Sequence, residues 1–136
     1  MEITRVAIDT DVLIDLLRNK GKVVDFIGDM ERKGYLLSTT VINAFELIHG
    51  AYRSKKSTEN LASTKRLLER LVVLEMDLSS AENAGRIYSE LEAKGKSIGL
   101  RDAMMGAIAL TNGYTLATRN VGHLQKIEGL NLISAP

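Results

Sequence analysis

The sequence predicts an α/β domain with three layers, in which a mostly parallel central sheet is flanked by helices. Two observations support this prediction. Short apolar runs of strand length alternate with longer segments whose apolar residues recur at helical spacing. These helical segments are long enough to act as the crossover connections that parallel strands require. A chain of 136 residues, 45% of them apolar and 26% charged, has the size and composition of one globular unit, so we expect residues 1–136 to form a single domain.

The expected strands and helices follow one another along the whole chain. Strands are expected at the short apolar runs of residues 3–8, 35–38, 71–74, 114–117 and 130–133. Helices are expected over residues 10–17, 23–33, 40–53, 58–70, 79–94, 101–111 and 121–127. Because parallel strands are joined by crossovers, the helices should cover both faces of the sheet.

Several of these boundaries carry a capping or termination signal. Thr10 or Asp11 is expected to cap the first helix, and Gly34 to end the second. Ser79 and Glu82 have the spacing of a capping box at the start of the fifth helix. These signals indicate where the strands end, and in parallel α/β sheets reactive residues collect at the carboxyl ends of the strands.

The composition excludes several classes of protein. The chain has no cysteine, so it is neither a disulfide scaffold, nor a thiolate zinc finger, nor a thiol enzyme. The longest nearly apolar run, residues 103–110, is far shorter than the ~20 residues that a membrane span needs. Charged residues at Glu2, Arg5 and Asp9 come too early for a signal peptide. We therefore expect a cytoplasmic protein that does not insert into a membrane.

Charge is nearly balanced overall but unevenly distributed. The chain has 18 Lys and Arg and 17 Asp and Glu, a net charge of +1. Residues 49–70 hold six basic and two acidic residues, a local net charge of +4. The basic residues of this stretch are Arg53, Lys55, Lys56, Lys65, Arg66 and Arg70. Such a stretch is either a solvated helix face or a surface for phosphate groups, and the sequence leaves both interpretations open.

Three acidic residues occupy positions that a surface role explains poorly. Asp9 directly follows the first apolar strand, and Asp102 opens a helix that is otherwise apolar. Glu46 lies in a helix that is apolar on nearly every side, and burying its carboxylate without a partner is unfavourable. Each also has an ordinary interpretation as a turn, cap or first-turn residue. Asp11 is ambiguous in the same way, because it can serve as the helix cap.

The predicted topology can bring Asp9, Glu46 and Asp102 to one edge of the sheet. Their charges would repel, and Mg²⁺ or Mn²⁺ would neutralise them with the oxygen ligands that these ions prefer. A metal held there suits the hydrolysis of a phosphodiester bond by an activated water. The sequence offers no competing nucleophile triad or phosphate-binding glycine loop. The two histidines, His49 and His123, are interpreted as structural or surface residues.

Four segments, in this order, resemble the PIN domain of VapC-type toxins. They are residues 8–14 (Ile-Asp-Thr-Asp-Val-Leu-Ile), 43–50 (Asn-Ala-Phe-Glu-Leu-Ile-His-Gly), 98–103 (Ile-Gly-Leu-Arg-Asp-Ala) and 116–120 (Leu-Ala-Thr-Arg-Asn). Each segment is short, but together they span the chain. The resemblance implies a PIN-like fold, an endoribonuclease that depends on Mg²⁺ or Mn²⁺, a homodimer, and neutralisation by a small VapB-like antitoxin. Asp9, Glu46 and Asp102 match the acidic positions of the family, so the resemblance assigns them to metal binding and catalysis.

Two positions depart from the pattern of the family. Many PIN domains have a fourth acid where this chain has Asn120, which can orient a water or ligate weakly but adds no charge. The position three residues before Glu46 is often Thr and is here Asn43, which can still cap or hydrogen-bond. Thr118, at the end of the fourth strand, is a candidate to hydrogen-bond a carboxylate or the scissile phosphate. We include Asn120 and Thr118 among the expected catalytic residues.

Two other functions fit parts of the sequence. Asp9 and Asp11 after an apolar strand also fit the nucleophile and acid of a haloacid-dehalogenase-like phosphatase, although the C-terminal third lacks the late pair of acids that this family needs. A binding module with the PIN fold and no catalysis is the second alternative, because Asn120 replaces an acid.

RNA is expected to be held through its phosphates. Aromatic residues make up 4% of the chain, too few for a base-stacking platform, so binding should be sensitive to salt. The expected RNA-binding residues are Arg53, Lys55 and Lys56, with Lys65 and Arg66 beside them and Arg101 and Arg119 next to site positions.

Overall fold

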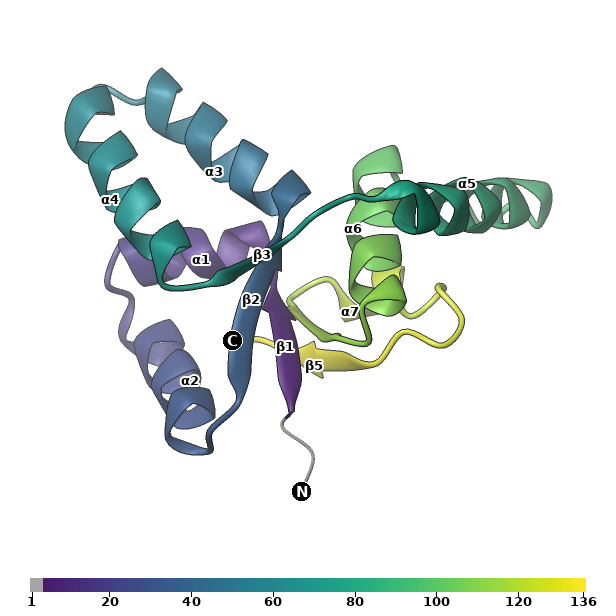
Figure 1. Ribbon diagram of the computed structural model, residues 1–136, viewed down its shortest axis with the longest axis horizontal. Helices are drawn as coiled ribbons and strands as arrows, with labels where there is room; N and C mark the ends of the chain where they lie inside the picture. Colours follow the sequence, from purple (N-terminus) through teal and green to yellow (C-terminus); the bar gives the residue numbers. More distant parts are fainter. Residues whose placement is uncertain (1–3) are drawn as a thin grey trace.

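The computed structural model describes residues 4–136, so Ile3, the first residue of the first expected strand, lies outside the described residues. The strands are β1 (Arg5–Ile8), β2 (Leu36–Thr40), β3 (Val72–Leu74), β4 (Thr115–Thr118) and β5 (Leu132–Ser134). The helices are α1 (Thr10–Leu17), α2 (Gly21–Arg32), α3 (Val41–Arg53), α4 (Ser57–Glu69), α5 (Leu78–Ala93), α6 (Leu100–Thr111) and α7 (Val121–Leu124) (Figure 1). Every expected element is present, with ends that differ by up to three residues. Among residues 4–136, none of the helices has the length and apolar character needed to cross a membrane.

The five strands form one sheet in the order β3-β2-β1-β4-β5. All neighbouring pairs are parallel, which confirms the predicted architecture and makes the sheet wholly rather than mostly parallel. The chain builds the sheet outward in one direction from β1 to β3, and then returns to place β4 on the other side of β1. The crevice outside the carboxyl ends of β1 and β4, where the strand order reverses, is therefore the expected place for a site.

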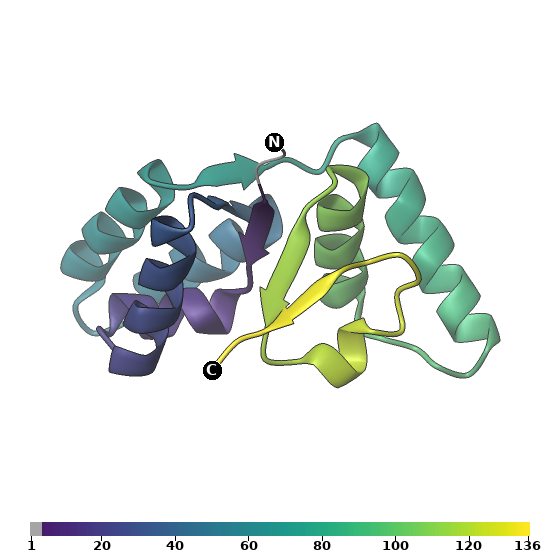
Figure 2. The same cartoon turned by 90° about the horizontal axis from the view of Figure 1, so that it is seen from below.

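Helices cover the two faces of the sheet and bury a separate apolar core on each (Figure 2). On one face Val6, Ile8 and Ala117 pack with residues of α1 to α4. On the other face Ala7 and Leu116 pack with residues of α5 and α6. Successive residues of β1 and β4 thus point into opposite cores, as the two-residue period of a strand requires. Strands buried on both faces need the continuous apolar sequence seen in residues 6–8.

Two helix caps differ from the sequence prediction. Asp9, rather than Thr10 or Asp11, is the N-cap of α1, and its side chain accepts a hydrogen bond from the backbone nitrogen of Thr10. The prediction of a capping box at residues 79 and 82 is wrong, because α5 begins one residue earlier and Asp77 caps it by accepting a hydrogen bond from the Ser80 nitrogen at 2.8 Å. This bond from the backbone lowers the pKa of the Asp77 carboxyl below its usual value. Asp is as good an N-cap as Ser, so the sequence alone did not discriminate between them.

Candidate active site

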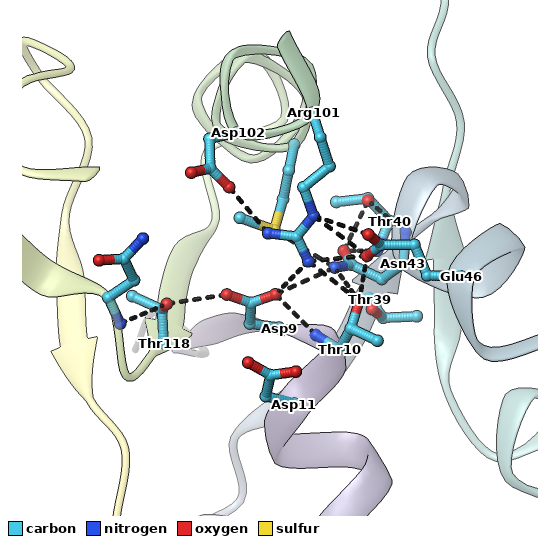
Figure 3. Close-up of polar contacts among 12 residues, drawn as sticks. Asp9, Thr10, Asp11, Thr39, Thr40, Asn43, Glu46, Arg101, Asp102 and Thr118 are labelled. Carbon is cyan, nitrogen blue, oxygen red and sulfur yellow. Dashed lines mark hydrogen bonds and ion pairs between the residues drawn. The ribbon is translucent and has the colours of Figure 1, made fainter. Parts of the chain in front are cut away.

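Four segments that are distant in the sequence meet at the carboxyl edge of the sheet (Figure 3). Asp9 follows β1, and Thr118 ends β4, the neighbouring strand. Glu46 lies in the second turn of α3, and Asp102 lies in the first turn of α6. The three carboxylates singled out from the sequence are therefore close together, at the point where the strand order reverses.

Asp9 is held in a fixed orientation by groups from three elements. Its Oδ1 atom accepts hydrogen bonds from the Thr10 backbone nitrogen at 2.7 Å and from the Asn43 side-chain nitrogen at 3.3 Å. Its Oδ2 atom accepts a hydrogen bond from the Thr118 hydroxyl at 2.8 Å. Only 6% of Asp9 is exposed, so the carboxylate depends on these donors rather than on water.

Asn43 joins this network to the start of α3. Its side-chain oxygen accepts hydrogen bonds from the Thr40 hydroxyl at 2.7 Å and the Thr40 backbone nitrogen at 3.3 Å, so that the two residues form a capping box. Its side-chain nitrogen donates to the Thr10 hydroxyl at 2.9 Å as well as to Asp9. Asn43 is fully buried, and its oxygen is thus turned to the helix while its nitrogen is turned to the site. The capping box uses Asn43, which leaves Glu46 free for the site.

Glu46 is partly exposed and accepts hydrogen bonds on both carboxylate oxygens. The Thr10 hydroxyl donates to its Oε1 atom at 2.5 Å, and the Arg101 guanidinium donates to Oε1 from Nη2 at 2.7 Å and to Oε2 from Nε at 3.0 Å. Burial acts to raise the pKa of Glu46, but hydrogen bonds from Arg101 and Thr10 outweigh it, and the pKa lies below its usual value. Glu46 is therefore ionised at neutral pH.

The Arg101 guanidinium lies between the three carboxylates. Its Nη2 atom is 2.7 Å from Asp9 Oδ1 as well as from Glu46 Oε1, and its Nη1 atom is 2.8 Å from Asp102 Oδ1. Burial acts to lower the pKa of Arg101, but these three acids raise it above its usual value. From the sequence we expect the acids to face one another and Arg101, next to a site position, to contact RNA. The structure instead gives the acids an internal counter-ion.

His123 belongs to the site, although the sequence favours a structural or surface role for it. Its Nδ1 atom is 2.9 Å from Asp102 Oδ2, opposite the oxygen that contacts Arg101, and the two form an ion pair whenever the imidazole is protonated. His123 lies in α7, which begins three residues after β4 ends at the same edge of the sheet. Its place just after a strand that ends at the site is the feature of the sequence that could have indicated this role. Thr10, which was considered as a helix cap, also belongs to the site through its hydroxyl.

Several predicted residues lie at or beyond the rim of this arrangement. The side chain of Asn120 is exposed, and its backbone nitrogen donates to the Thr118 hydroxyl at 3.0 Å. The Arg119 guanidinium turns away to pair with Asp15 at 2.6 Å. His49 stacks on Phe45 on the outer face of α3. The carboxylate of Asp11 is exposed and lies outside the hydrogen-bonded cluster (Figure 3).

The predicted RNA-binding residues of α3 lie farther from the carboxylates. Arg53, Lys55 and Lys56 are exposed at the end of α3 and in the connection to α4, and we call these three residues the basic tip. Arg53 is seven residues beyond Glu46, which corresponds to about 10 Å along a helix. Lys65 and Arg66 are exposed on α4. The carboxylates and the basic tip are thus separate features joined by one helix.

The three carboxylates suit a divalent cation, but the Arg101 guanidinium lies in the space between them. Asp9, Glu46 and Asp102 supply oxygen ligands from three segments, as Mg²⁺ and Mn²⁺ prefer. Among the residues that the structure describes, no three acidic or histidine side chains are arranged to hold a metal ion as they stand. The reason is visible at the site, because the guanidinium occupies the space that the acids share.

Comparisons with known proteins agree with the fold. The sequence profile of the PIN domain matches residues 6–129. The chain is 30% identical over 125 residues to the tRNA(fMet)-specific endonuclease VapC of Salmonella typhimurium, covering 92% of this chain and 93% of the relative. It is 29% identical over 128 residues to ribonuclease VapC1 of Haemophilus influenzae, covering 90% of this chain and 92% of that protein.

A solved structure gives the same result at the level of the fold. The structure is similar to a chain in the crystal structure of DNA-bound VapBC from Salmonella typhimurium, with a TM-score of 0.85 and 27% identity. The match covers 97% of this chain and 98% of that one. The family profile, the relatives and the fold agree along nearly the whole chain. The chain therefore belongs to the PIN domain family and, within it, to the VapC-type ribonucleases.

Proposed function

We propose that this protein is a toxin endoribonuclease that cleaves RNA phosphodiester bonds with Mg²⁺ or Mn²⁺. The observation that carries the proposal is the convergence of Asp9, Glu46 and Asp102, from three separate segments, on one point at the carboxyl edge of the sheet. Membership in the PIN domain family rules out the alternative function, a haloacid-dehalogenase-like phosphatase.

In this proposal the three acids hold the metal, and the surrounding polar groups keep them in place. A divalent cation bound there would supply the Lewis acid that polarises the scissile phosphate and activates the attacking water. Thr118 and the Thr10 backbone nitrogen fix the two oxygens of Asp9. Thr10 orients Glu46 through its hydroxyl, and His123 orients Asp102. Asn120, exposed beside Thr118, is positioned at the rim to contact a water or the substrate.

RNA would be drawn to the basic residues through its phosphates. The basic tip is exposed, and a chain laid along α3 from Arg53 to Glu46 would lead from the tip to the acids. Arg119 is the weaker candidate, because its guanidinium is paired with Asp15. The positive side chains of the basic tip would compensate for the repulsion between the acids and the phosphates of RNA.

Exposed apolar side chains support the proposal of protein partners. Large apolar side chains are exposed on α3, where Phe45 and Tyr52 are 66% and 64% exposed, and at the start of α6, where Leu100 is 59% exposed beside Arg101. Exposed apolar groups of this size favour an interface. We propose that they serve a homodimer and a VapB-like antitoxin in the cytoplasm. Sedimentation of the protein alone, and with the product of an adjacent reading frame that encodes a short protein, tests both assemblies.

Cleavage of RNA by matched variants tests the catalytic proposal. Wild-type protein, Asp9→Asn and Asp11→Asn are incubated with a cellular RNA pool in Mn²⁺ or in EDTA. Asp11→Asn removes the same charge two residues away, outside the cluster, and should cleave like the wild type. Asp9→Asn should lose roughly a thousandfold in rate, because a metal held by carboxylates contributes several kcal/mol.

Two outcomes would count against the proposal. Equal cleavage by wild type and Asp9→Asn would mean that the acids are not the site. No cleavage by wild type in Mn²⁺, with a normally folded protein, would favour the non-catalytic binding module.

A further inference from the structure

Arg101 is the main partner of the three carboxylates. Four of their six oxygens, one on Asp9, both on Glu46 and one on Asp102, accept a hydrogen bond from its guanidinium. The remaining two face other side chains, since Asp9 Oδ2 accepts from Thr118 and Asp102 Oδ2 faces His123. A metal that enters this site must therefore replace existing partners, and Arg101 is a partner that all three acids share.

The guanidinium and a divalent cation cannot share that centre. The Nη atoms of Arg101 lie 2.7 to 2.8 Å from one oxygen of each acid. Mg²⁺ requires oxygens at about 2.0–2.1 Å in near-octahedral order, and so would occupy the same space. Arginine stays protonated in proteins, so it cannot give way by losing its charge. It can leave only by moving.

The position of Arg101 permits such a movement. Its side chain is 34% exposed and begins in the first turn of α6, at the mouth of the site. The acids keep other partners without it, because Asp9 retains Thr10, Asn43 and Thr118, Glu46 retains the Thr10 hydroxyl and Asp102 retains His123. Rotation of one long side chain into solvent would therefore open the centre and leave the framework in place.

We propose that Arg101 is a built-in counter-ion that competes with the catalytic metal and holds the metal-free site closed. This inference rests on the proposed function, since it concerns the metal of that same site. In the metal-free protein the guanidinium neutralises part of the charge of the three acids. When the metal binds, the guanidinium leaves for the rim, where it can contact a phosphate of RNA.

Metal binding in the absence of RNA tests the proposal directly. Mn²⁺ is titrated into wild type, Arg101→Gln, Arg101→Lys and Arg86→Gln, and free Mn²⁺ is followed by electron paramagnetic resonance. Arg86→Gln is the matched control, because it removes the same charge from an exposed ion pair with Glu90 on α5. Arg101→Gln should bind Mn²⁺ at least about tenfold more tightly than wild type, since it removes both a competitor and a nearby positive charge. Arg86→Gln should bind like wild type.

Thermal unfolding gives a second readout that does not depend on activity. Without Arg101 the three acids lose the counter-ion that they share, so Arg101→Gln should melt lower than wild type in EDTA and should gain more from Mn²⁺. Arg101→Lys keeps the charge but loses the planar fork that reaches all three acids. Its Mn²⁺ affinity should therefore lie between those of wild type and Arg101→Gln. If Arg101→Gln does not fold in EDTA, Arg101→Lys decides the comparison.

The outcomes separate this inference from the proposed function. Equal or weaker Mn²⁺ binding by both Arg101 variants, with metal-dependent cleavage intact in wild type, would overturn the inference and leave the ribonuclease proposal standing. An absence of Mn²⁺ binding in wild type and in both Arg101 variants would overturn the inference together with the metal-dependent mechanism.

Discussion

The carboxylate site and the basic tip are both charged, but they are built in opposite ways. At the site, Asp9 and Asp102 are buried, and each oxygen of the three acids has a fixed partner. At the basic tip, Arg53, Lys55 and Lys56 extend into solvent. The carboxylates depend on their exact positions, so the loss of one contact disturbs several groups. The residues of the basic tip contribute through their total charge, and salt weakens that contribution.

The largest effect in this comparison should follow from Asn43→Ala. The change removes a buried amide that joins Thr40, Thr10 and Asp9. It takes away the acceptor of the Thr40 hydroxyl and backbone nitrogen, and one donor each from Thr10 and Asp9. We expect a loss of about 2–4 kcal/mol in the free energy of unfolding, because unpaired buried groups add to the lost hydrogen bonds. Urea unfolding measures it.

Asn112→Ala is the matched control for this change. Asn112 donates to the Ile108 carbonyl at the exposed end of α6, far from the carboxylates in the fold. Its loss should cost less than about 1 kcal/mol. Equal destabilisation by the two variants would mean that the network around Asn43 has no special role.

Thr118→Val tests the orientation of Asp9 with little change in volume. The variant removes the donor to Asp9 Oδ2 and the acceptor for the Asn120 nitrogen. The cleavage rate should fall about ten- to a hundredfold, because a displaced ligand misplaces the reacting groups. Thr115→Val, at the other end of the same strand, should leave the rate unchanged. A normal rate in Thr118→Val would show that Asp9 needs no fixed orientation.

The sequence predicted the acids better than it predicted their partners. Asp9 and Thr118 follow from the rule that reactive residues end parallel strands, and Glu46 and Asp102 stand out as charges in apolar helices. Arg101 does not stand out in this way, because a long basic side chain can extend into solvent from almost any helix position. Its role depends on the direction of a long side chain, which only the packing of α6 against α3 decides.

Substitutions at the basic tip should have smaller effects on RNA binding, and the effects of separate substitutions should add. Lys55→Gln removes one exposed charge and, if that charge contacts one phosphate, lowers RNA affinity about fivefold at 0.1 M salt and the salt slope by about 0.7. Fluorescence anisotropy with a labelled RNA and Asp9→Asn as the common background measures binding without cleavage. Lys94→Gln, exposed beyond α5 on the opposite side of the sheet, should bind like the parent protein. Similar losses in both variants would indicate general attraction rather than a binding surface.

The smallest effect should appear in the pH dependence of stability, and it belongs to Glu46. Despite burial, hydrogen bonds from Arg101 and Thr10 keep the pKa of Glu46 below its unfolded value, so the folded state favours the ionised carboxylate. This contribution is complete above the unfolded pKa and is lost as the pH falls through the folded pKa. The effect is modest because Glu46 is partly exposed and water screens its contact with Arg101.

Glu46→Gln isolates this contribution, because glutamine resembles the protonated acid and does not titrate. Urea unfolding of both proteins in EDTA should show a difference that is constant near neutral pH and shrinks as the pH falls below about 4.5. Parallel pH curves would mean that Arg101 does not favour the charged form of Glu46, and they would weaken the case for Arg101 as the counter-ion of the site. A difference that grows at low pH would reverse the sign and place Glu46 among the groups that burial keeps neutral.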